Sequence, residues 1–351
     1  MSIDTAVRAP ARWVSAKWLG GPLSDTLFAL LWVPFAVAAL AADDHPALLT
    51  WLVAATLTFS FMHQPLTLWL VYGDSDQLAG GRRLFTWTPP VTAMLVVAGL
   101  LIAPIAVVLV AGIWNAAHTL RQRYGITRIY GRMAGQTDGR AEHAMLWSWF
   151  ALTVVLVAAN PRIGAQTSRS GIAGRNRAAL DHLNVSGTVA VAILAAAVIA
   201  AAVLTGQWLR AEANRPATNP AKWLYLGSTS ALLVMTVANP IAGFMGYVGS
   251  RAAEYLVIVH RRVGQAPRSP GPRGRGPLYG FVGTTGPTAF IVTYLISAAA
   301  VVVILDRIGN RTMASAVALL LGGLHHFYNG LIWKLRRPEV ATALLRPGGG
   351  G

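Results

Sequence analysis

Two adjacent histidines lie in the middle of a long apolar segment near the C-terminus. His325 and His326 fall within the run from residue 313 to 334, and Asn329 follows one helical turn later. A helix of this length covers about 33 Å, which is enough to cross the hydrocarbon layer of a membrane. Ionisable side chains at that depth are costly and normally face a bundle interior, a cavity or a partner. We therefore expect both imidazoles to face other polar groups inside a helical bundle.

Three further ionisable side chains interrupt other apolar runs. His63 lies in the run 48–71, His118 in 104–126 and Glu254 in 240–262. If all four runs cross the membrane in the same direction, a rise of 1.5 Å per residue places these groups and the histidine pair about 18–23 Å from the outer end. The sequence therefore predicts one layer of five ionisable groups, contributed by four helices.

Amides accompany these groups at helical spacing. Asn115 and Gln122 flank His118 at i−3 and i+4, and Asn329 follows His325 by four residues, so each amide shares a face with an imidazole. Metal-bound imidazoles commonly donate their second N–H to such neighbours. We therefore expect Asn115, Gln122 and Asn329 to support a site. Its predicted metal ligands are His63, His118, His325, His326 and Glu254, and Glu254 is also a candidate general base.

The sequence contains no cysteine, which excludes thiolate ligands, iron–sulfur clusters and thiol catalysis. Imidazoles with one carboxylate favour non-haem iron, with zinc, copper, manganese or a bis-histidine haem as alternatives. A different interpretation stays open, in which the buried histidines and Glu254 form hydrogen bonds between helices or a proton relay in a transporter.

The composition indicates the elements that position these residues. Of 351 residues, 54% are hydrophobic and only 12% are charged, which is typical of a polytopic membrane protein. We predict an all-α transmembrane bundle of about ten helices, with helix breaks at Pro104 and at Asn239-Pro240. The apolar runs are 24–42, 48–71, 88–103, 104–126, 143–160, 186–208, 222–239, 240–262, 288–306 and 313–334.

The charge distribution predicts the topology. The net charge is +16, and most basic residues lie between apolar runs rather than in a basic domain, so nucleic-acid binding is not expected. The positive-inside rule places both termini in the cytoplasm, as in a multi-pass protein of a bacterial cytoplasmic membrane. The arginines between residues 162 and 177 do not fit that rule.

The apolar runs also indicate the domain organisation. We expect an interfacial segment over 1–23, one transmembrane domain over 24–337 and a tail over 338–351; the oligomeric state stays open.

The histidine segments resemble those of uncharacterised bacterial integral membrane proteins and, more distantly, of Brp/Blh-type β-carotene dioxygenases. The resemblance lies in His63 to Asp74, in His118 to Gly125, in Glu254-Tyr255-Leu256 and in His325 to Lys334. It implies a polytopic helical fold with a non-haem iron held by histidines from several helices. Asn329 stands where that family has an acid, and Glu254 lies where it has histidines.

Together these observations predict a membrane-embedded, metal-dependent oxidoreductase of the oxygenase type. Its substrate would be an apolar or amphiphilic small molecule that enters from the lipid, because the surrounding helices are apolar. A transporter with a histidine–glutamate relay and a b-type haem protein are the alternatives.

Overall fold

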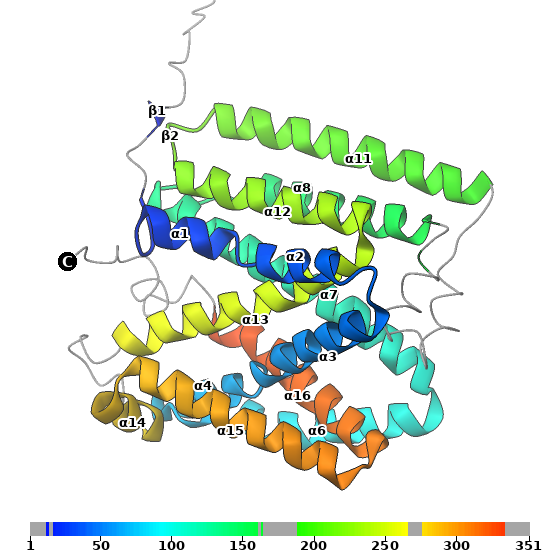
Figure 1. Ribbon diagram of the computed structural model, residues 1–351. Helices are drawn as coiled ribbons and strands as arrows, with labels where there is room; N and C mark the ends of the chain where they lie inside the picture. The colour runs from blue at the N-terminus through cyan, green and yellow to red at the C-terminus, as the bar shows by residue number, and fades with distance from the viewer. Residues whose placement is uncertain (1–11, 14–16, 161–162, 164–187, 266–275, 334–351) are drawn as a thin grey trace, which may run out of the picture. The chain divides into compact units, whose positions relative to one another are not determined.

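The structure is a computed structural model, and it describes residues 12–13, 17–160, 163, 188–265 and 276–333 (Figure 1). The described residues form an all-α protein, as the sequence predicts, with one pair of two-residue strands, β1 (Arg12–Trp13) and β2 (Ala217–Thr218). The C-terminal tail and nearly all of the segment 162–177 lie outside the described residues.

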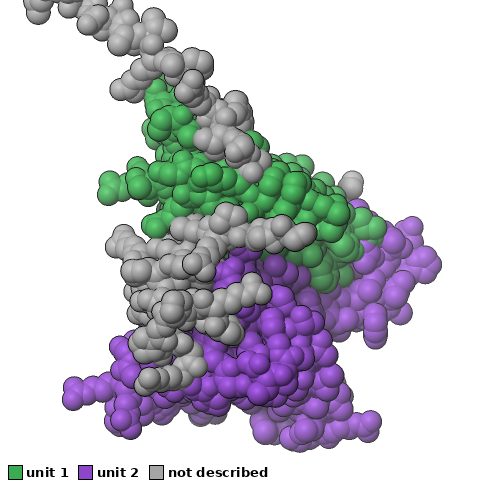
Figure 2. All heavy atoms as spheres, turned by 90° about the vertical axis from the view of Figure 1, so that its left-hand side faces the viewer, with its two compact units in different colours: residues 1–37, 120–246, 345–351 green, residues 38–119, 247–344 purple. Residues whose placement is uncertain are grey.

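Contacts divide the chain into two compact units, shown in green and purple in Figure 2. Unit 1 comprises residues 1–37, 120–246 and 345–351, and unit 2 comprises 38–119 and 247–344. Three helices run from one unit into the other along the chain: α2 (Val33–Ala41), α7 (Pro104–Met133) and α13 (Pro240–Gln265).

Unit 1 is a layer of helices in which α8 packs against α11 and α12, and α12 packs against α1. The bounds of these helices are α1 (Pro22–Ala29), α8 (Arg140–Ala158), α11 (Thr188–Ala213) and α12 (Pro220–Ala238). Buried apolar side chains of α7, α8, α11 and α12 form its core, with Leu120, Met145, Leu146, Trp208 and Leu226 at the centre.

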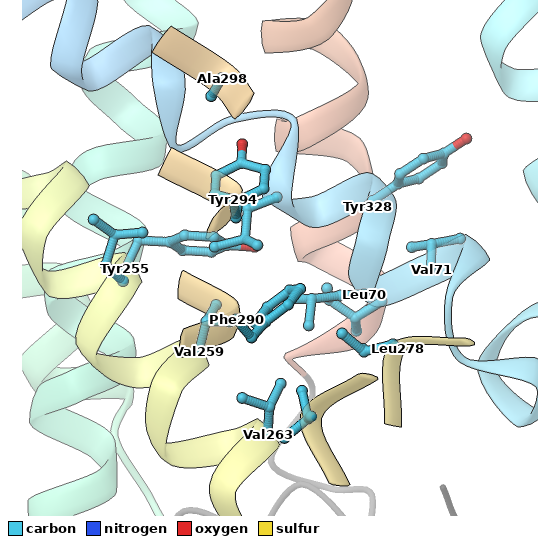
Figure 3. Close-up of a cluster of buried hydrophobic side chains, with 14 of the residues drawn as sticks. Leu70, Val71, Tyr255, Val259, Val263, Leu278, Phe290, Tyr294, Ala298 and Tyr328 are labelled. Carbon is cyan, nitrogen blue, oxygen red and sulfur yellow. The ribbon is translucent and has the colours of Figure 1, made fainter. Parts of the chain in front are cut away.

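In unit 2, α16 packs against α6, α4 and α15, and α15 also contacts α3 and α14. The helices of this unit are α3 (Pro46–Met62), α4 (Leu66–Tyr72), α5 (Ser75–Ala79), α6 (Arg82–Ile102), α14 (Pro277–Thr285), α15 (Pro287–Ile308) and α16 (Arg311–Ile332). The apolar core lies beside α4, where Leu70, Val259 and Phe290 point toward one another (Figure 3).

Prolines end the helices where the sequence predicts breaks. Helix α6 ends at Ile102 and α7 begins at Pro104, while α12 ends at Ala238 and α13 begins at Pro240. The side chain of Asn239 caps α13 by accepting from the backbone N–H of Ala242 at 3.0 Å. Proline lacks a backbone N–H and its ring clashes with the preceding turn, so each proline starts a new helix at no cost in hydrogen bonds.

Six described helical segments are long and apolar enough to cross a membrane, or seven if the bent pair α1–α2 forms one span. They are α3–α4, α6, α7, α8, α11 and α15. Each of the ten apolar runs of the sequence falls on a helix or on two consecutive helices, but α12, α13 and α16 are not among these six. The surfaces of the apolar helices are themselves apolar, as at Ile102, which is 83% exposed. Contiguous exposed apolar surface of this kind is typical of contact with lipid.

Candidate metal site and adjoining cavity in unit 2

The break between α3 and α4 forms the base of the candidate site. Residues His63 to Pro65 leave the helical pattern, which exposes the carbonyl groups of the preceding turn. The hydroxyl of Tyr294 donates to the carbonyl of Met62, and His325 Nδ1 lies 3.3 Å from the carbonyl of Gln64. Polar side chains of α15 and α16 therefore contact backbone carbonyl groups at this break.

Four imidazoles from three helices meet at this break. The ring centroids of His118 and His326 are 4.3 Å apart, and those of His63 and His325 are 4.8 Å apart. His118, His325 and His326 each offer a ring nitrogen within 4.8 Å of the others. A metal about 2.1 Å from each nitrogen allows separations up to about 4.2 Å, so small side-chain movements would complete a three-histidine site.

The amide of Asn329 fixes the protonation of two of these rings. Trp333 Nε1 is a pure donor and lies 3.1 Å from Asn329 Oδ1, so that atom is the oxygen of the amide. The amide nitrogen then faces His325 Nε2 at 2.9 Å and His118 Nε2 at 3.3 Å, and it donates to both. Both Nε2 atoms are therefore acceptors, and their lone pairs point to the amide nitrogen of Asn329. To bind a metal at Nε2, both rings would exchange this hydrogen bond for coordination.

A second chain of hydrogen bonds holds His325 from its other side. Its Nδ1 lies 2.7 Å from the hydroxyl of Thr67, and that hydroxyl lies 2.7 Å from the hydroxyl of Tyr255. Tyr255 also donates to Asn329 Oδ1 at 3.1 Å. Because Nε2 of His325 is an acceptor, Nδ1 carries the proton and donates it to Thr67. The ring is therefore oriented as the ring of a metal-binding histidine usually is.

A buried arginine contacts the third imidazole. Arg251 is fully buried on α13, bonds to the side-chain oxygen of Asn115, and places Nη2 3.4 Å from His326 Nδ1. A guanidinium can only donate, so Nδ1 of His326 is its acceptor and Nε2 carries the proton. The positive charge of Arg251 opposes a cation at this position.

The other predicted site residues have different surroundings. His63 is fully buried and stacks edge-on against His325, but it lies outside the group of three described histidines whose nitrogens are close enough for one metal. Glu254 is fully buried one turn after Arg251 and also lies outside that group. Gln122 lies one turn after His118, in the part of α7 that belongs to unit 1. Asp74 caps α5 by accepting from the backbone N–H groups of Asp76 and Gln77.

Sequence reasoning did not assign roles to Gln64, Arg251, Tyr255 or Trp333 in this site. The spacing of two of these residues could have indicated their place in the site. Trp333 follows Asn329 by four residues, and Tyr255 follows Arg251 by four. Each pair therefore shares a helix face. The hydrogen-bonding role of Trp333 depends on the orientation of the amide, which spacing does not reveal.

A cavity of about 1190 Å³ adjoins the imidazoles. Its wall is formed mainly by apolar side chains of α3, α6, α7 and α16, and His326 and Asn115 are among its few polar lining residues. Ligand pockets in proteins are usually about 300–1,000 Å³, so this space accommodates a large molecule.

Unit 1 contains a buried ionic network that sequence reasoning missed. Lys222 is fully buried and pairs with Glu142 and with Glu212, the latter at 2.7 Å. Arg128 pairs with Glu142 at 3.1 Å, and Arg215 pairs with both carboxylates at 3.4 and 3.2 Å. These groups come from α7, α8, α12, the C-terminal end of α11 and the turn that follows it, so the network ties four helices together.

Comparison with protein-family models, curated proteins and solved structures gives no match for this chain. The resemblance to Brp/Blh-type dioxygenases accordingly stays a prediction from the histidine segments.

Proposed function

We propose that this protein is a membrane-embedded, metal-dependent oxidoreductase, with non-haem iron as the favoured metal and zinc or copper as alternatives. The observation that supports the proposal most directly is the convergence of His118, His325 and His326 beside a large apolar cavity. Three imidazoles leave coordination positions open for a substrate or dioxygen, and apolar walls exclude water from them. The substrate would be an apolar or amphiphilic molecule from the lipid bilayer.

The ring spacing favours a bare metal over haem. Two axial histidines of a haem bind on opposite faces of the porphyrin, which separates their ring centroids by about 6 Å when each Fe–N bond is about 2 Å. The described contacts between these imidazoles join centroids 4.3–5.5 Å apart. A porphyrin would require the rings to move apart.

A metal measurement with a matched control tests the proposal. We expect the purified wild-type protein to contain about one equivalent of metal by elemental mass spectrometry, and His118→Ala to lose most of it. His143→Ala makes the same chemical change at an exposed histidine of α8, which accepts from Trp147 at 2.9 Å, and should retain the metal. Metal-free wild-type protein, or equal occupancy in both variants, would overturn the proposal, and a Soret band would select haem.

The alternative is a proton relay in a transporter. It is favoured by the hydrogen bonds that join Tyr255, Thr67 and His325, whose hydroxyl and imidazole groups can each donate and accept a proton. Such a chain can pass a proton without a metal. Proton uptake by metal-free protein in liposomes, lost in His325→Ala, would support this function instead.

A further inference from the structure

The cavity in unit 2 is open on an apolar surface. Several lining residues are both apolar and exposed, including Trp87 at 68% and Leu95 at 64% on α6 and Val110 at 60% on α7. Exposed side chains of this kind on a membrane helix face lipid. A ligand can therefore reach the cavity from the hydrocarbon layer without crossing water.

One end of the cavity is polar and lies beside the imidazoles. Gln64, in the break between α3 and α4, lines the cavity, and its buried Oε1 has no hydrogen-bond partner. Gly322 leaves space beside this atom, since a Cβ there would lie only 3.3 Å from Oε1. An unsatisfied buried acceptor costs free energy, so a donor from a ligand would be stabilising here.

Two other lining residues offer donors at the same end. Arg251 uses the side-chain oxygen of Asn115, which leaves the amide N–H groups of Asn115 available to a ligand. Arg251 also faces Nδ1 of His326, so the proton of that ring is on Nε2. The polar end therefore presents an acceptor together with donors.

The lining lacks a counter-ion for a charged ligand. Among the described residues that line the cavity none is Asp, Glu, Lys or Arg, and Arg251 lies behind Asn115 and His326. Burying an unpaired charge against such a wall costs free energy. A neutral group that both donates and accepts hydrogen bonds can pair with the acceptor and the donors at the polar end.

We propose that the cavity binds a neutral alcohol with a long or polycyclic hydrocarbon body, oriented with its hydroxyl toward Gln64 and the imidazoles. The hydroxyl donates to Gln64 Oε1 and accepts from the amide of Asn115, while the hydrocarbon body lies between α6, α7 and α16. This inference rests on the proposed function, because it names the substrate class of the same site.

Binding to metal-stripped protein tests the inference separately from the metal proposal. Native mass spectrometry in detergent would compare geranylgeraniol with the carboxylic acid and the hydrocarbon of the same carbon skeleton. We expect the alcohol to bind about 10-fold more tightly than either analogue, since a hydrogen-bonding site disfavours a ligand that leaves its polar groups unpaired. Metal content is measured separately, on protein that has not been treated to remove metal. The metal proposal and the alcohol proposal can therefore fail independently of each other.

Two variants locate the binding. Gln64→Leu should weaken binding of the alcohol about 10-fold and leave binding of the hydrocarbon unchanged, because the substitution removes only the hydrogen-bond acceptor. Ala318→Trp fills the cavity and should abolish binding of all three ligands, whereas Ala200→Trp, at an exposed position of α11, should have no effect. Preference for the acid or the hydrocarbon, binding unaffected by Ala318→Trp, or no binding of the alcohol would overturn the inference.

Discussion

The protonation of the candidate site is governed by side chains that can only donate hydrogen bonds. The indole of Trp333 orients the amide of Asn329, and the amide makes Nε2 of His118 and of His325 acceptors. Arg251 makes Nδ1 of His326 an acceptor in the same way. Two of the three imidazoles are thus prepared to bind a cation at Nε2, while the third is held beside a fixed positive charge.

This arrangement predicts that Arg251 weakens metal binding. A unit charge within about 6 Å of a divalent cation is repelled by more than 1 kcal/mol even at an effective dielectric constant of about 20. Arg251→Gln should therefore raise metal affinity by about 10-fold or more in a competition titration with a chelator. Arg210→Gln removes a charge from an exposed position of α11 and serves as the control. Weaker binding in Arg251→Gln would show that the guanidinium instead holds His326 in place for the metal.

At the scale of elements, each unit uses polar groups to hold helices together. In unit 2, the break before α4 brings Thr67 and the carbonyl of Gln64 to His325. In unit 1, charges from α7, α8, α11 and α12 form one network around Lys222. Buried ion pairs offset the cost of desolvation only when every charge has a partner.

Removal of Lys222 should therefore destabilise unit 1 strongly. Lys222→Met leaves Glu142 and Glu212 buried with one cation fewer, and loss of one partner from a buried pair typically costs about 3–5 kcal/mol. We expect a decrease of that size in the free energy of unfolding, measured by denaturant titration in mixed micelles. Arg210→Met, at an exposed position, should change it by less than about 0.5 kcal/mol. A change below about 1 kcal/mol in Lys222→Met would show that the remaining arginines neutralise both carboxylates.

At the scale of the whole molecule, the number of helices that cross a membrane would decide on which side each terminus lies. Six described helical segments are long and apolar enough to cross a membrane, or seven if the bent pair α1–α2 counts as one span. The sequence contains ten apolar runs. An even number of spans puts both termini on one side, and an odd number puts them on opposite sides.

Reporter fusions distinguish these topologies. The distribution of Lys and Arg predicts that fusions at Ala6 and at Arg346 both report the cytoplasm. A fusion near Arg175 tests the segment that does not fit the rule. Termini on opposite sides would require an odd number of spans, and the common depth predicted for the histidines would no longer follow.

The sequence by itself determined the all-α class and the helix breaks at Pro104 and Pro240. It also predicted a layer of His63, His118, His325, His326 and Glu254, of which three histidines lie close enough for one metal. These features depend on local chemistry and on helical spacing. The apolar composition predicts helices that lie in lipid, and an imidazole within such a helix needs a polar partner at the same depth in the membrane.

Only the tertiary structure decided which groups touch. It brought Trp333 and Tyr255 to Asn329, Arg251 to His326 and Lys222 to two carboxylates. It also formed the cavity mainly from α3, α6, α7 and α16, which bring together parts of the chain from residue 57 to residue 327. Spacing fixes the face of a helix on which a residue lies, but the opposing helix and the direction of each hydrogen bond depend on how side chains pack in three dimensions.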